Sequence, residues 1–158
     1  KHRIVLHIGG VYGDKESAIK RFKENFKKLS KDIQERLIIE NDDKSYTSSE
    51  VLAIAQDLDI PMVFDVHHFN CNHQEDEVMA ELFPQILETW PQEETPKIHF
   101  SSPRNEEKFL SHADYIDSAD FNQFMSQAKE WTDRDFNVML ECKKKDKALR
   151  KLRYELDY

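Results

Sequence analysis

PMVFDVHHFN, residues 61–70, is the stretch of the sequence that decides the fold. Its apolar run at 62–64 follows a proline and predicts a short, buried β-strand. The run ends in Asp65, with His67 and His68 directly behind it. A carboxylate and two imidazoles crowded at the end of a buried strand need a reason. Metal ligation at the carboxyl end of a parallel strand is one such reason.

The same pattern of an apolar run that ends in a metal-ligand type of residue occurs at four other places. These runs end at His7, Glu40, His99 and Glu141. Helix-like sequence lies between the runs, and this alternation predicts an α/β protein with a parallel sheet. Right-handed crossovers place all the strand ends on one edge of the sheet, so the polar residues are expected to converge there.

The expected strands and helices follow from the periodicity of the apolar residues. Asp14 is expected to cap the first helix, and the residues 47–50 read as a capping box for the next one. Pro84 should break or restart the third helix. The loop 103–111 is longer than a minimal connection, which is typical of a functional loop. The strands are expected at residues 3–8, 36–39, 62–64, 97–100 and 136–140.

Five strand–helix units are fewer than the eight of a (β/α)8 barrel, which usually has about 250 residues and carries its active site at this edge. The sequence has 158 residues. We therefore expect 1–158 to form a single domain with an α/β fold, a partial TIM-type barrel of about five parallel strand–helix units. It would be the C-terminal part of a barrel that lacks the first strand–helix units.

Composition excludes several classes of protein. With 39% hydrophobic and 34% charged residues the chain is expected to be soluble, and no apolar stretch approaches the roughly 20 residues of a membrane span. Cys71 and Cys142 are isolated, which is typical of a reduced, cytoplasmic protein. The net charge of −8 argues against non-specific binding of nucleic acid, but a nuclease that offsets its carboxylates with cations is compatible with it.

A set of histidines and carboxylates makes up the candidate site. A lone histidine after a strand is more often a core or surface residue, but convergence of several such residues favours ligation. The set suits Zn²⁺, Mn²⁺ or Fe²⁺, and two or three ions would stabilise the attacking and leaving oxygens of a phosphoryl displacement. The candidate metal ligands are His7, Glu40, Asp65, His68, His99, His112 and Glu141.

Two spacings within this set carry further expectations. Asp65 and His68 are three residues apart, so the strand must end between them for both side chains to reach one site. Lys97 lies two residues before His99 and shares its face of the strand. A lysine that points inward is costly, so we expect it to be either paired with Asp65 or Glu40 or chemically modified.

Several of these strings together resemble one family of enzymes. LHIGGVYGDKESA, LIIENDD, FDVHHF, PKIHFSSPR with the following SHADYID, and VMLECKKKDKAL are similar to segments of the UV damage endonucleases. These repair enzymes belong to the endonuclease IV and xylose isomerase-like barrel superfamily. The resemblance runs through essentially the whole chain. It implies a metal-dependent barrel enzyme that nicks damaged double-stranded DNA on the 5′ side of UV photoproducts.

The resemblance also implies cofactors and roles for particular residues. The cofactor would be a divalent metal, with manganese expected first and zinc or iron as alternatives, present as two or three ions in the complete protein. The family's ligands fall on the seven residues named above, and its carboxylated lysine falls on Lys97. Glu40, Lys97 and Glu141 would be catalytic. Family members carry more of the barrel ahead of the strand that ends at His7, including at least one further histidine ligand.

Two other functions stay open at the level of the sequence. One is a sugar isomerase or epimerase on the same scaffold, although the many histidines favour a nuclease. The other is a non-catalytic, metal-binding fragment, since the activity of an incomplete barrel is doubtful. An incomplete barrel also exposes a sheet edge, which predicts self-association of the chain.

Overall fold

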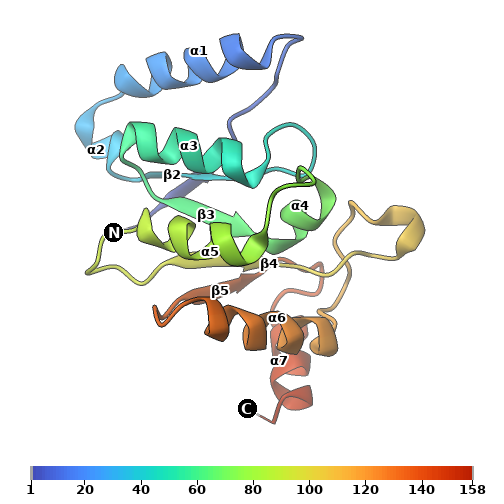
Figure 1. Cartoon of the computed structure of the whole chain (residues 1–158). Coiled ribbons are helices and arrows are strands. Elements are labelled where there is room, and N and C mark those ends of the chain that lie inside the picture. The colour runs from blue at the N-terminus through green and yellow to red at the C-terminus, as the bar shows by residue number, and fades with distance from the viewer. Residues whose placement is uncertain (1, 158) are drawn as a thin grey trace.

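A parallel sheet of five strands forms the centre of the molecule, which a computed structural model describes for residues 2–157. The strands pair in sequence order, and every neighbouring pair is parallel. The sheet curls into a half-barrel with the helices on its outer side (Figure 1). The expected partial barrel of the α/β class is thereby confirmed. The strands are β1 (Ile4–Leu6), β2 (Leu37–Glu40), β3 (Met62–Asp65), β4 (Lys97–Phe100) and β5 (Asn137–Leu140).

Helices follow each strand, and their beginnings agree with the capping residues in the sequence. Asp14 accepts a hydrogen bond from the Ser17 amide (3.0 Å), and Thr47 forms the capping box with Glu50. None of the described helices is long and apolar enough to cross a lipid bilayer. The helices are α1 (Lys15–Lys27), α2 (Lys31–Gln34), α3 (Ser48–Leu58), α4 (Val66–Cys71), α5 (Met79–Glu88), the 3₁₀ turn η1 (Glu106–Lys108), α6 (Ser118–Trp131) and α7 (Asp146–Glu155).

Helix α5 corrects one expectation, because it continues through Pro84 instead of breaking there. A proline inside a helix costs about 3 kcal/mol. Phe83, Ile86 and Leu87, on both sides of the proline, are each at most 1% exposed. Burying one such side chain contributes about 1.5–3 kcal/mol, so together they outweigh the cost of the proline.

The concave face of the sheet has an apolar floor below a polar rim. Ile38 and Val63 are fully buried and pack with Trp90, whose indole Nε1–H donates to the Met62 carbonyl (2.7 Å). Because side chains two residues apart on a strand share a face, the residues that follow this floor toward the carboxyl ends are Glu40 on β2 and Asp65 on β3. The two carboxylates therefore lie at the same edge of the sheet, next to buried apolar side chains.

The two outer strands leave apolar side chains uncovered. Within the described residues, β1 and β5 each have a single neighbouring strand. Ile4 on β1 is 48% exposed, and Met139 on β5 is 47% exposed. This exposure agrees with an open half-barrel. Self-association through these edges stays a prediction.

Glu77 ties the loop before α5 to the beginning of α3. Its carboxylate accepts hydrogen bonds from the Thr47 hydroxyl (2.6 Å), the Ser49 amide (2.9 Å), the Ser49 hydroxyl and the Gln74 amide (3.0 Å). Burial alone would raise the pKa of Glu77, but these hydrogen bonds lower it below its ordinary value of 4.5. Glu77 is therefore more acidic in the folded chain than in the unfolded chain.

The Glu77→Gln variant is expected to lose about 2 kcal/mol of unfolding free energy at neutral pH, because charge-assisted hydrogen bonds are lost. A lowered pKa stabilises the fold above the unfolded pKa, and this contribution disappears as the pH falls through the folded pKa. The difference between variant and wild type should therefore shrink in acid. Urea unfolding across this pH range measures it, with the exposed Glu75→Gln as control. A difference that does not change with pH would contradict the assignment.

Candidate metal centre

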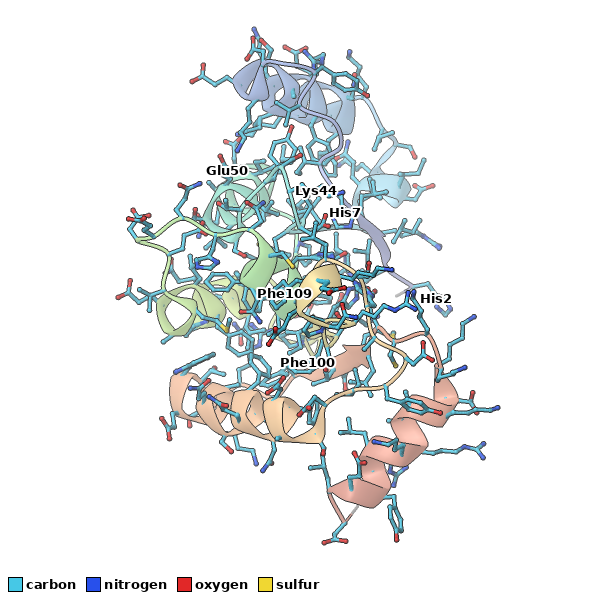
Figure 2. The ribbon with its side chains drawn as sticks, turned by 90° about the vertical axis from the view of Figure 1, so that its right-hand side faces the viewer. His2, His7, Lys44, Glu50, Phe100 and Phe109 are labelled. Atoms are coloured by element: carbon cyan, nitrogen blue, oxygen red, sulfur yellow. The ribbon has the colours of Figure 1, made fainter. Side chains whose placement is uncertain are left out.

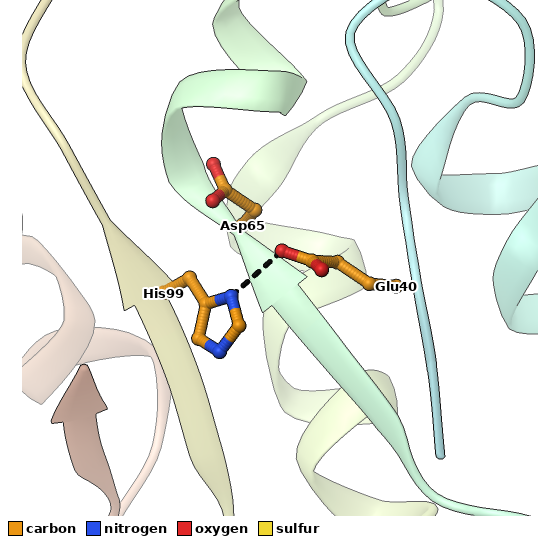
Figure 3. A group of neighbouring side chains, drawn as sticks. All are labelled: Glu40, Asp65 and His99. Atoms are coloured by element: carbon orange, nitrogen blue, oxygen red, sulfur yellow. Dashed lines mark hydrogen bonds and ion pairs between the residues drawn. The ribbon is translucent and has the colours of Figure 1, made fainter. Parts of the chain in front are cut away.

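Three buried residues form the centre of the site. Glu40, Asp65 and His99 lie at the ends of β2, β3 and β4 and are 4%, 0% and 5% exposed. Each offers one ligand atom, and these atoms lie within 4.8 Å of one another (Figure 3). Imidazole nitrogen and carboxylate oxygen are ligand types that divalent transition metals take, so this group could hold such an ion.

Glu40 is surrounded by imidazoles. Its Oε1 accepts a hydrogen bond from His99 Nδ1 (2.7 Å) and lies 3.8 Å from His68 Nδ1. Its Oε2 lies 3.6 Å from His7 Nε2. One carboxylate thus faces three histidines that come from three different segments of the chain. Both oxygens of Glu40 would therefore be available to ions held by these histidines.

Glu141 and His112 extend the cluster toward β5. Glu141 Oε1 lies 3.2 Å from His99 Nδ1, and Glu141 Oε2 lies 3.9 Å from His112 Nδ1. The rings of His112 and His68 are 6.2 Å apart between centroids. All seven residues that the sequence selected therefore lie in one continuous group. Their roles as ligands stay predictions.

The loop between β4 and α6 reaches over the same edge. Figure 2 looks onto this edge, with the loop that carries Phe109 in front of the sheet and His7 beside it. The base of the loop is closed by an antiparallel bridge between Pro103 and His112. This bridge explains how a residue in a long polar loop comes to lie beside the strand ends.

Asp65 begins helix α4 and so brings His68 back to the site. Its Oδ1 accepts a hydrogen bond from the His68 amide (2.8 Å), and its Oδ2 lies 3.9 Å from His68 Nδ1. The expectation that the strand ends between these residues is confirmed. Asp65 Oδ2 is buried and, within residues 2–157, has no hydrogen-bond partner. An anionic oxygen buried alone is costly, so a cation fits this position.

The charges around His99 also favour a cation. Burial of the His99 imidazole by itself lowers its pKa, but the hydrogen bond to Glu40 and the charges of Glu40, Glu141 and Asp65 raise the pKa above its ordinary value. The site therefore stabilises positive charge, as a proton on the imidazole or as a divalent ion. Protons and metal ions compete for such a ligand, so metal affinity should rise with pH.

Lys97 corrects the expectation of an ion pair. It lies two residues before His99 on β4 and is half-buried. Neither Asp65 nor Glu40 pairs with its side chain, and the described part of the chain holds no other hydrogen bond or ion pair to the Lys97 ammonium. The alternative, chemical modification of the amine, stays a prediction.

Asn41 is the residue that sequence reasoning missed. It follows Glu40 directly, is fully buried and contacts both Asp65 and His68. In the string LIIENDD an asparagine after a strand looks like the first residue of a solvated loop, as Asp42 and Asp43 do. Only the position of β3 beside it reveals what its amide does.

The family model described as UV-endonuclease UvdE matches residues 1–158. A "UV DNA damage endonuclease" of Bacillus cereus (strain G9842) is 48% identical over 154 residues, which are 97% of this chain and 48% of that protein. A protein of the same description from Bacillus velezensis is 43% identical, with the same coverage. The chain thus spans about half the length of the curated relatives it matches.

A solved structure described as "Crystal Structure of SacUVDE" has the same fold. Its TM-score is 0.84 and its sequence is 33% identical, with 98% of this chain and 52% of that chain covered. The fold, the cluster at the strand ends and the match over the whole sequence agree. The chain therefore belongs to the UV-endonuclease UvdE family.

Proposed function

We propose that this chain is part of a DNA repair endonuclease that nicks the phosphodiester 5′ to UV photoproducts by metal-assisted hydrolysis. The observation that carries the proposal is the buried group of Glu40, Asp65 and His99, with the unpartnered Asp65 Oδ2. Relatives named UV DNA damage endonuclease support the reaction. The partner in this proposal is damaged double-stranded DNA, and the location would be the cytoplasm.

The metal ligands in this proposal are the residues of the cluster. Manganese is the expected metal, with zinc or iron as alternatives and two or three ions in the complete protein. Bound divalent ions supply a Lewis acid and lower the pKa of water, which favours hydrolysis of a phosphodiester. Glu40, Asp65 and His99 would form the core of the site, and the outer ligands would be His7, His68, His112 and Glu141.

Glu40, Glu141 and Lys97 have further roles in the proposal. Glu40 holds the two sides of the site together, since both of its oxygens face imidazoles. The side chain of Glu141 is 35% exposed, against 5% for that of Glu40, so Glu141 can accept a proton from the attacking water. Lys97 would carry a carbamate, which turns a half-buried cation into an anion that faces the metals.

We also propose that residues 1–158 are one domain and the C-terminal part of a (β/α)8 barrel. The open half-barrel and the coverage of about half of each relative support this arrangement. The strand ends at His7 and Glu141 would then face the remaining strands. Those strands would supply the rest of the ligands and of the DNA-binding surface.

A nicking assay tests the proposed function. UV-irradiated supercoiled plasmid is incubated with Mn²⁺ and a protein of the relatives' length that contains this chain, beside unirradiated plasmid and a chelator control. We expect nicks only with irradiation and metal. Absence of damage-dependent nicking would contradict the proposal. Turnover of a ketose would instead revive the isomerase alternative, which the family match disfavours.

A further inference from the structure

We propose that Asn41 is a positioning residue that orients two metal ligands, Asp65 and His68, without itself binding the ion. The inference rests on the proposed metal site and deepens it. Asn41 is neutral, 0% exposed and adjacent to Glu40 in the chain. Three hydrogen bonds carry the argument.

The first two bonds join the Asn41 side chain to the backbone of Asp65. Asn41 Nδ2 donates to the Asp65 carbonyl (2.9 Å), and Asn41 Oδ1 accepts from the Asp65 amide (2.9 Å). The paired register of β2 and β3 ends at Glu40 and Val63. The side-chain amide therefore acts as one more peptide group and continues the pairing to the point where β3 turns into α4.

The third bond joins the backbone of Asn41 to the ring of His68. The Asn41 carbonyl lies 2.9 Å from His68 Nδ1. A carbonyl oxygen can only accept, so Nδ1 must carry the proton. In the neutral imidazole Nε2 then keeps its lone pair, which makes Nε2 the ligand atom.

The first two bonds explain why an amide side chain is required at position 41, because they use both its N–H group and its carbonyl oxygen. Aspartate has nearly the same shape but no N–H group, so the Asp65 carbonyl would lose its donor. The added negative charge beside Glu40 and Asp65 would by itself strengthen the attraction of a cation, so a lower Mn²⁺ affinity in this variant reports the loss of positioning. Partners that orient ligands typically change metal affinity by about 10- to 100-fold when they are removed.

The first test compares Asn41→Asp with a matched variant, Asn72→Asp. Asn72 Nδ2 also donates to a backbone carbonyl, that of Asp42 (3.0 Å), in a partly buried position. That bond holds no candidate ligand. We expect Asn41→Asp to lower Mn²⁺ affinity about 10- to 100-fold in an EPR titration, and Asn72→Asp to change it less than about twofold.

The second test needs no metal and separates positioning from folding. Nitrogen NMR of histidine-labelled protein reports which ring nitrogen of His68 is protonated. We expect the Nδ1–H tautomer in the wild type. In Asn41→Asp the backbone carbonyl that accepts this proton is no longer held in place by the side-chain bond to the Asp65 carbonyl, so we expect a mixture of tautomers. Thermal unfolding of both variants measures the purely structural effect of losing one hydrogen bond.

The outcomes distinguish this inference from the proposed function. An Nε2–H tautomer in the wild type would overturn the role of Asn41, and this measurement applies even if the variant does not fold. Equal loss of stability in both variants, with Mn²⁺ affinity and tautomer unchanged, would also overturn it. A wild type that binds no Mn²⁺ but holds His68 as Nδ1–H would contradict the metal site while leaving the positioning of His68 intact.

Discussion

The Glu40→Gln variant is expected to bind Mn²⁺ at least about 100-fold more weakly and to lose damage-dependent nicking. Glu40 is buried, and its two oxygens face three imidazoles, those of His7, His68 and His99. Glutamine keeps the volume but offers one neutral oxygen in place of two charged ones. The affinity for every ion that Glu40 would contact should therefore decrease.

This effect can be separated from unfolding. Glutamine can still accept the hydrogen bond from His99 Nδ1, and its neutral amide relieves the repulsion between the carboxylates of Glu40 and Asp65, so the metal-free variant should be about as stable as the wild type. Glu88→Gln, at the exposed end of α5, is the matched control and should bind Mn²⁺ normally. Calorimetric titration and the plasmid assay measure both quantities. Unchanged affinity in Glu40→Gln would contradict the central place given to this residue.

Residues 1–158 alone are expected to nick UV-irradiated plasmid at least about 100-fold more slowly than a protein of the relatives' length. Misplacing reacting groups by about 1 Å can cost about that factor. Within the described chain the site is buried at the central strand β3, where Asp65 is 0% exposed, and open beside the outer strand β1, where the side chain of His7 is 46% exposed. At least one ion should therefore be held by too few ligands.

Recognition of the damage should fail in the same comparison. Extruding a lesion from the DNA stack costs a few kcal/mol and needs side chains that fill the gap. Tyr12, in the loop after β1, is an aromatic candidate for this role and is 86% exposed. The two proteins are compared on irradiated and unirradiated plasmid at equal Mn²⁺ occupancy. Efficient, damage-specific nicking by residues 1–158 would show that the remaining strands are dispensable.

The parts of the fold that the sequence predicted are those that depend on local periodicity. Apolar runs separated by amphipathic segments determine the sheet, and residues at strand ends must share an edge in a parallel sheet. The sequence alone therefore predicted that Glu40, Asp65 and His99 lie close together. The continuous helix through Pro84 depends instead on how much α5 buries against its neighbours, which no local pattern records.

In the site, too, local spacing predicted some features, while others depend on contacts between distant segments. The turn after Asp65 was required by the spacing to His68, but helix α4, which makes that turn, was not foreseen. Lys97 was placed on the correct face, yet its lack of a carboxylate partner among the described residues depends on side-chain positions. Asn41 escaped notice because its partners lie on a neighbouring strand, 24 residues away in the chain.

One oxygen of Asp65 caps helix α4, and the other belongs to the candidate metal site. The opening of the helix and the release of an ion are therefore coupled. Oδ1 accepts a hydrogen bond from the His68 amide at the beginning of α4, while Oδ2 lies 3.9 Å from His68 Nδ1. Fraying of the first turn of α4 would release the carboxylate from its cap and swing His68 away from Glu40. Metal binding would oppose that fraying, so the ion and the helix share one local opening equilibrium. The residence time of the metal is then set in part by how often a six-residue helix opens at its first turn.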